Sequence, residues 1–168
     1  LRARRSSMQM IFQDPVTSLD PRWNIEAIVR EPLDNFGIGT TAERKEKVIQ
    51  LLERVGIRAD QAECYPHELS GGQCQRVGIA RALSLSPHVI VADEPVSALD
   101  VSVRAQVVNL LSDLRDDMGL ALLFISHDIG LVAHVSDRIA VMYLGEIVEM
   151  GDTSQVLNDP KHPYTMGL

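Results

Sequence analysis

The chain has 168 residues, of which 45% are hydrophobic, with a formal net charge of −7. This balance is typical of one folded domain with a hydrophobic core and excludes a disordered tail. The longest apolar stretch, GLALLFIS at 119–126, is far shorter than the ~20 residues of a transmembrane helix, so a role at a membrane would depend on a partner. The negative charge argues against nucleic-acid binding, because the basic cluster LRARR at 1–5 is too short to form a cationic surface.

The first predicted element is a strand at 8–12, with the sequence MQMIF. It enters a turn at Asp14 and Pro15, two residues that commonly begin turns. Gln13 is therefore expected at the exit of the strand.

Helical periodicity follows the turn. Apolar residues recur at helical spacing over 23–36, and a second helix is predicted to begin at Thr40. Thr40-x-x-Glu43 has the form of a capping box, and Gly56 is a plausible end of that helix. Residues 22–85 are expected to form a helical unit.

Beyond residue 87 the pattern alternates between strands and helices. The segment HVIVAD is a short, continuous apolar run of the kind found in buried parallel strands. The predicted order is strand 88–93, helix 103–114, strand 120–126, a helical turn at 129–135, and two strands within 138–151 that turn near Gly145. This order predicts an α/β fold with a parallel sheet, whose ligands bind at the carboxyl ends of the strands.

Three residues with acid–base or metal-binding side chains follow predicted strands. Asp93 and Glu94 end the strand VIVAD, where one carboxylate could hold Mg²⁺ and the other could orient or deprotonate a water molecule. An acidic turn is an equally good interpretation of these two residues alone. His127 ends another strand, and a neutral imidazole there could hydrogen-bond a phosphate or the water. Taken alone, it would more often be structural.

The segment ELSGGQCQRV suggests a helix with an anion at its start. Ser70, Gly71 and Gly72 would open the helix, whose first N–H groups could bind a phosphate that approaches across the glycines. A simple N-cap by the serine is the alternative, and neither interpretation excludes the other. Gln73 and Arg76 are expected to stay free as polar or positioning groups.

Four motifs, MIFQDP, LSGGQCQRV, VIVADEPVSALD and LLFISHD, occur in this order. Together they resemble the nucleotide-binding subunit of an ATP-binding cassette (ABC) transporter over about residues 8–126. The resemblance implies a P-loop NTPase (ABC ATPase) core with a parallel sheet plus a helical subdomain. It also implies ATP and Mg²⁺ as cofactors.

The resemblance gives each candidate residue a role. Gln13 would be the Q-loop residue that contacts Mg²⁺ and water, and Glu94 the catalytic base. The other implied roles are the signature for Ser70, Gly71, Gly72 and Gln73, the Walker B magnesium site for Asp93, the D loop for residues 97–100 with Asp100, and the switch histidine for His127. In this family the signature of one subunit contacts the γ-phosphate of ATP held by another.

The chain contains no G-x-x-x-x-G-K-[ST] phosphate loop, which precedes the Q loop in this family. We therefore expect an N-terminally truncated nucleotide-binding domain that is inactive alone. Its expected parts are a helical subdomain at 22–85, a core at 86–150 and the start of a C-terminal extension at 151–168. Cys74 departs from the family pattern of a polar or basic residue, and an exposed, oxidisable thiol near the phosphate is expected.

Three further segments, FQDPVTSLDPRW, DVSVRAQVVNLL and NDPKHPYT, resemble the oligopeptide, dipeptide and nickel importer branch. This implies an ATPase subunit of an importer for peptides or related small solutes. Its expected partners are transmembrane permease subunits and a second ATP-binding subunit in a head-to-tail dimer, without nucleic acid. It would lie at the cytoplasmic face of the inner membrane, peripherally, through the permease alone.

Two alternatives stay open. One is a non-catalytic fragment that keeps the signature and the permease-contact surface. The other is a DNA-maintenance ABC ATPase, which would have long coiled coils between the Q loop and the signature, whereas this interval is short. Trp23 falls where the family meets its permease, and a place in the core is the equally open alternative.

Overall fold

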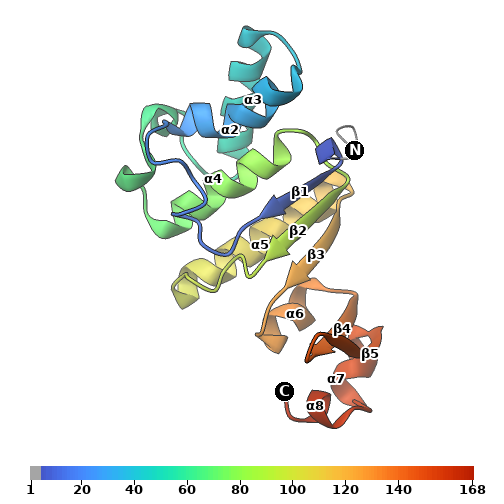
Figure 1. Cartoon of the computed structure of the whole chain (residues 1–168). Coiled ribbons are helices and arrows are strands. Elements are labelled where there is room, and N and C mark those ends of the chain that lie inside the picture. The colour runs from blue at the N-terminus through green and yellow to red at the C-terminus, as the bar shows by residue number, and fades with distance from the viewer. Residues whose placement is uncertain (1–4) are drawn as a thin grey trace. The chain divides into compact units, whose positions relative to one another are not determined.

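The computed structural model describes residues 5–168, which fall into two compact units (Figure 1). The first unit ends at Ile125, and the second covers Ser126–Leu168. The first unit contains β1 (Met8–Ile11), α2 (Ile25–Phe36), α3 (Thr41–Arg54), the 3₁₀ helices η1 (Ala59–Glu63) and η2 (Pro66–Glu68), α4 (Gly71–Leu83), β2 (Val89–Asp93), α5 (Val101–Met118) and β3 (Ala121–Ile125). The second contains α6 (Ile129–Val135), β4 (Arg138–Tyr143), β5 (Glu146–Asp152), α7 (Thr153–Asn158) and α8 (Pro163–Met166).

The first unit is built on a parallel sheet in the order β1-β2-β3, which confirms the predicted α/β class. Met10 lies opposite Val91, and Val91 opposite Leu123. Because all three strands run in the same direction, their carboxyl ends meet at one edge of the sheet. The segments that begin at Phe12, Glu94 and Ser126 all leave from this edge.

The two faces of the sheet differ in burial. Ile11, Ile90 and Ala92 alternate along the strands on the buried face. The opposite face is apolar but open: Met8 and Leu123 are each 56% exposed. A contiguous apolar surface of this kind favours association.

A bundle of α2, α3 and α4 packs beside the sheet, and α4 also contacts β1 and α5. The apolar stripes of the two predicted helices face the bundle interior, with Val29 and Leu52 fully buried. The predicted capping box is confirmed: the Glu43 N–H donates to Thr40 Oγ1 at 3.3 Å, and the Thr40 N–H donates to Glu43 Oε2 at 2.7 Å.

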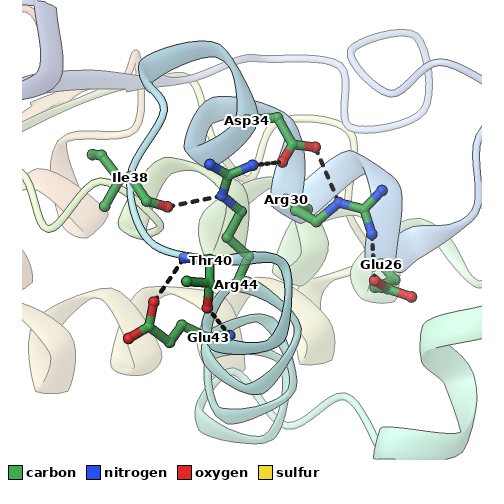
Figure 2. Close-up of polar contacts among 7 residues, drawn as sticks. All are labelled: Glu26, Arg30, Asp34, Ile38, Thr40, Glu43 and Arg44. Atoms are coloured by element: carbon green, nitrogen blue, oxygen red, sulfur yellow. Dashed lines mark hydrogen bonds and ion pairs between the residues drawn. The ribbon is translucent and has the colours of Figure 1, made fainter.

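An ion-pair network fixes the turn between α2 and α3 (Figure 2). Arg30 bridges Glu26 at 2.6 Å and Asp34 at 3.0 Å, while Arg44 reaches Asp34 at 2.6 Å and donates from Nε to Ile38 O at 2.8 Å. Burial raises the pKa of Asp34, but the hydrogen bonds from Arg30 and Arg44 outweigh this and the pKa is lowered. Partly exposed pairs of this kind add little stability, so the main effect of the network is to set the geometry of the turn.

The second unit is an antiparallel hairpin with short helices. Strands β4 and β5 pair on either side of Leu144 and Gly145, which have positive φ angles of 50° and 86°, as tight hairpin turns require. The predicted turn near Gly145 is thus confirmed. Ile139, Val141 and Val156 form the core of this unit.

The NDPKHPYT segment is attached to β5 through Glu149. The Lys161 N–H donates to Glu149 Oε1 at 2.8 Å, and the His162 N–H donates to Glu149 Oε2 at 3.0 Å. The neighbouring Thr165 hydroxyl and these N–H groups lower the pKa of Glu149.

Within residues 5–168, no helix combines the length and the hydropathy needed to cross a membrane. The subdomain boundaries proposed from the sequence stay predictions, since the helical bundle and the whole β1-β2-β3 sheet belong to one unit.

Candidate functional site

Gln13, Asp93 and Glu94 lie together where β1 and β2 end. Asp93 is the last residue of β2 and is partly buried. The Gln13 Nε2 group donates a hydrogen bond of 2.8 Å to Glu94 Oε2. The sequence placed all three at strand exits, and the direct bond between residues 81 positions apart follows from the pairing of β1 with β2.

The Glu94 backbone is held in an uncommon conformation. Its φ angle is +43°, in the left-handed region that costs a non-glycine residue roughly 1–3 kcal/mol unless the surroundings enforce it. The Glu94 N–H donates to Ile125 O at 3.0 Å, and its carbonyl accepts from the Ser97 N–H at 3.2 Å and from Ser97 Oγ at 3.0 Å. These bonds fix the peptide groups on both sides of the Glu94 side chain.

The residues at this edge suit Mg²⁺ when it is bound together with phosphate. The carboxylates of Asp93 and Glu94 and the amide carbonyl of Gln13 are hard oxygen ligands, which Mg²⁺ prefers. Among residues 5–168, no group of three or more histidine, cysteine or carboxylate side chains is arranged to hold a metal by itself. Mg²⁺ in phosphoryl-transfer sites is commonly held by one or two carboxylates plus phosphate oxygens and water, so the donor set fits.

Ser70 caps α4, as the sequence predicted. The Gln73 N–H donates to Ser70 Oγ at 3.3 Å, and the Ser70 N–H donates to Gln73 Oε1 at 2.9 Å, which completes a capping box. Ser70 and Gly71 are exposed at the start of the helix. Phosphate binding there stays a prediction.

Close packing against α5 explains why the second glycine of the motif, Gly72, has no side chain. A Cβ atom added at Gly72 would lie 2.4 Å from Val103 Cγ1, whereas one added at Gly71 would meet Leu99 Cδ2 at 3.8 Å, an ordinary contact. Gly72 therefore lets the start of α4 approach α5 closely. At Gly71 there is space for a side chain. A substitution at Gly71 can therefore change phosphate binding without disturbing the fold.

Gly72→Ala is expected to destabilise the fold by about 1–3 kcal/mol, because the added methyl overpacks the contact with Val103. Gly71→Ala is the matched control and should cost less. Val103→Ala in the Gly72→Ala background should recover part of the loss, which a double-mutant cycle by chemical denaturation measures. Equal losses for both glycines, without coupling to Val103, would contradict this packing role.

Comparison with known proteins identifies the family. The sequence profile described as ABC transporter matches residues 1–97. The chain belongs to the ABC transporter family.

Curated relatives in this ABC family are similar over nearly the whole chain. The oligopeptide transport ATP-binding protein OppF of Haemophilus influenzae is 56% identical over 98% of this chain, and AppF of Bacillus subtilis, with the same description, is 52% identical over 98%. The glutathione import ATP-binding protein GsiA of Salmonella typhimurium is 56% identical over 100% of it. The matched regions are 50% of OppF, 50% of AppF and 27% of GsiA, so the chain spans about half the length of the first two.

Solved structures agree with the fold. CbiO1 from Clostridium perfringens, part of the ABC transporter complex CbiONQ, has a TM-score of 0.82 and 29% identity, covering 92% of this chain and 61% of its own. The ATP-binding cassette MJ0796, solved as a dimer with ADP and phosphate, has a TM-score of 0.78 and 30% identity, covering 90% and 65%. The predicted fold class, a partial ABC ATPase domain, is confirmed.

The expectation for Cys74 is wrong. This residue of the ABC signature helix is fully buried, its Sγ donates to Pro66 O at 3.4 Å, and burial raises the pKa of the thiol. Helix α4 contacts α2, α3 and α5, so position 74 faces the interior rather than solvent. A buried thiol with a raised pKa is poorly reactive, so an oxidisable group beside the phosphate is excluded.

Arg76 acts as a positioning group, one of the roles expected for it. Its Nη1 donates to Val55 O at 2.7 Å and its Nη2 to Gln106 Oε1 at 3.2 Å. It therefore ties α4 to the end of α3 and to α5. Its hydrogen-bond acceptors belong to neighbouring helices, so the sequence of α4 alone does not reveal them.

Arg81 was not identified from the sequence, although it connects the signature helix to the Q-loop segment. Its Nη1 donates to Ser18 O at 2.8 Å, and its guanidinium lies 6.0 Å from the centre of the Phe12 ring. Burial lowers the pKa of Arg81, and the charge of Glu31 opposes that shift. One feature of the sequence could have indicated its burial: Arg81 is a charged residue between Ala80 and Ala82 on a helix otherwise rich in apolar residues.

The D-loop residues connect β2 to α5. Val96 and Leu99 are buried, and Asp100 is the N-cap residue of α5, with its carbonyl accepting from the Arg104 N–H at 2.8 Å. The Asp100 carboxylate makes no capping hydrogen bond within the described part of the chain. An exposed Asp100 is compatible with the predicted binding role, which stays a prediction.

His127 belongs to the second unit, where it is exposed just before α6. The next residue, Asp128, caps that helix: the Leu131 N–H donates to Asp128 Oδ1 at 3.2 Å, and the Asp128 N–H donates to Ser126 Oγ at 3.1 Å. The switch role of His127 stays a prediction.

Proposed function

We propose that the chain is part of an ATP-binding and hydrolysing subunit of an importer for peptides or related small solutes. The observation that carries the proposal is the Gln13–Glu94 hydrogen bond beside Asp93 at the carboxyl edge of the sheet. The similarity to relatives described as oligopeptide, dipeptide and glutathione transport proteins supports the substrate class.

Bound MgATP would supply the γ-phosphoryl group and a divalent cation at this edge. Asp93 would hold the cation, directly or through water, while Gln13 would contact both the cation and the attacking water. Glu94 would orient that water and accept its proton. His127 would hydrogen-bond the γ-phosphate or the same water.

The signature would act on a different nucleotide. Ser70 and Gly71 are exposed at the start of α4, followed by Gly72 and Gln73, and N–H groups and the helix dipole there favour a phosphate. We propose that they contact ATP held by a second ATP-binding subunit in a head-to-tail dimer, with Asp100 at the same interface. Permease subunits would hold this dimer at the cytoplasmic face of the membrane.

A non-catalytic fragment is the second candidate. It is favoured by one feature, the absence of a G-x-x-x-x-G-K-[ST] pattern from these 168 residues. The DNA-maintenance alternative is disfavoured, because the interval between Gln13 and Ser70 folds as the compact helices α2 and α3 with short 3₁₀ turns.

Trp23 is a surface residue, 41% exposed, which excludes the core position. It lines a depression of about 350 Å³ together with Arg22, Asn24, Ala27, Arg30 and Asp34. An exposed tryptophan flanked by arginines has the composition of an interface hot spot. We propose that this depression contacts the permease.

The Trp23→Ala variant tests this proposal in the full-length gene product, reconstituted with its permease in vesicles. Wild type should hydrolyse ATP faster when peptide is supplied, whereas Trp23→Ala should bind the permease about 2 kcal/mol more weakly and lose transport at nearly unchanged thermal stability. Tyr65→Ala is the matched control, because Tyr65 is an aromatic residue with the same exposed fraction of 41%.

Two results would count against these proposals. An unfolding free energy lowered by about 3–5 kcal/mol in Trp23→Ala would indicate a packing role instead of a docking role. A wild-type complex that does not hydrolyse ATP would contradict the proposed function itself.

A further inference from the structure

In the turn after β2, Ser97 holds the carbonyl group of Glu94. The Ser97 N–H and Oγ both donate to the Glu94 carbonyl, at 3.2 Å and 3.0 Å. Pro95 occupies the second position of this four-residue turn, where its fixed φ angle is favourable. The buried side chains of Val96 and Leu99 anchor the turn to the protein interior, so the position of Ser97 is itself well determined.

The backbone of Glu94 has a positive φ angle that the surrounding contacts must stabilise. A φ angle of +43° persists in a non-glycine residue only where surrounding contacts enforce it. On one side the Glu94 N–H is held by Ile125 O at 3.0 Å. On the other side the carbonyl accepts from both donors of Ser97. Removing the hydroxyl would take away one of these two donors.

The direction of the Glu94 carboxylate depends on this backbone. Rotation about φ or ψ of Glu94 moves Cα–Cβ and therefore Oε2, which lies 2.8 Å from Gln13 Nε2. We propose that Ser97 is a positioning residue for Glu94. The Ser97 hydroxyl keeps the Glu94 carboxylate oriented toward the attacking water. The inference rests on the proposed function, because it assigns Ser97 a part in ATP hydrolysis.

The chain contains a matched control in Ser84. The Ser84 N–H and Oγ donate to the carbonyl three residues earlier, that of Arg81, at 3.2 Å and 2.8 Å, the same arrangement as at Ser97. Ser84 is fully buried directly after α4 and precedes β2, whose carboxyl end carries Asp93. Ser84→Ala therefore removes the same type of bond without touching Gln13, Asp93 or Glu94.

The experiment measures kcat and KM for ATP hydrolysis in the full-length gene product. Ser97→Ala should lower kcat by about tenfold to a hundredfold with little change in KM, because misplacing a reacting group by a fraction of an ångström to an ångström costs this much. Ser97→Thr keeps the hydroxyl and should restore most of kcat. Ser84→Ala should leave kcat unchanged.

Each outcome decides a different question. If Ser97→Ala does not fold, Ser97→Cys preserves the volume with a weak donor and should show the same loss of kcat. An unchanged kcat in the Ser97 variants, or a loss that Thr does not restore, would overturn the positioning role while hydrolysis by wild type upholds the proposed function. A wild type without hydrolysis would overturn the proposed function first.

Discussion

Replacing Glu94 by glutamine in the full-length gene product should leave ATP binding intact and lower turnover by ~10²–10⁴ or more. The amide cannot accept the proton of the attacking water, yet it has the size of the carboxylate and its carbonyl oxygen can still accept the 2.8 Å hydrogen bond from Gln13. Since hydrolysis would be blocked after binding, the ATP-bound dimer should accumulate. Phosphate release and gel filtration with ATP measure the two effects.

Glu53→Gln is the control for this change. Glu53 is an exposed carboxylate on α3, so the same substitution removes the same charge away from the sheet edge. It should leave turnover unchanged. Wild-type turnover in Glu94→Gln would remove Glu94 from the mechanism and leave Asp93 as the carboxylate to be tested.

The 168-residue chain on its own should bind MgATP negligibly and show no hydrolysis above background. A phosphate loop supplies backbone N–H groups, a lysine and a hydroxyl for Mg²⁺. Gln13, Asp93 and Glu94 cannot replace them, because two carboxylates without a cationic partner repel a triphosphate. Calorimetric titration of the purified chain checks this, and micromolar binding would contradict it.

The same chain should also self-associate through the open face of its sheet. Met8 and Leu123 are each 56% exposed there, and β1 and β3 are the outer strands of the sheet in the described residues. Met8→Lys together with Leu123→Lys should shift the chain toward monomer, measured by sedimentation velocity. Leu144→Lys is the control, since Leu144 is an 85% exposed leucine on the hairpin of the second unit. An equal effect of Leu144→Lys would point to association through another surface.

Local patterns in the sequence were sufficient for the strands and the longer helices, whereas η1, η2, α7 and α8 were not predicted. The Thr40–Glu43 capping box, the strand that ends at Asp93 and the hairpin turn at Gly145 all depend on residues within a few positions of one another. Backbone conformation at such sites is decided by capping, turn chemistry and apolar periodicity. These features can be recognised in the sequence without knowing which residues pack against them.

The burial and hydrogen bonding of a side chain that contacts several elements could not be predicted in this way. Cys74 was expected on an exposed helix face, but α4 contacts α2, α3 and α5. Burial of Cys74 and the bonds of Arg76 to Val55 and Gln106 follow from these neighbours. A helix surrounded on several sides has no single polar face.

By itself, then, the sequence determined the order of the elements, the exits of the strands and the residue types of the candidate site, since these depend on local propensity and on motifs at fixed spacing. Only the tertiary structure decided that Gln13 bonds Glu94 across 81 positions, that the Glu94 N–H is held by Ile125 O, and that Gly72 makes room for Val103. The physical reason is that each of these contacts joins segments that strand pairing or helix packing brings together. Their geometry depends on the register and the close approach of both partners, which neither segment specifies alone.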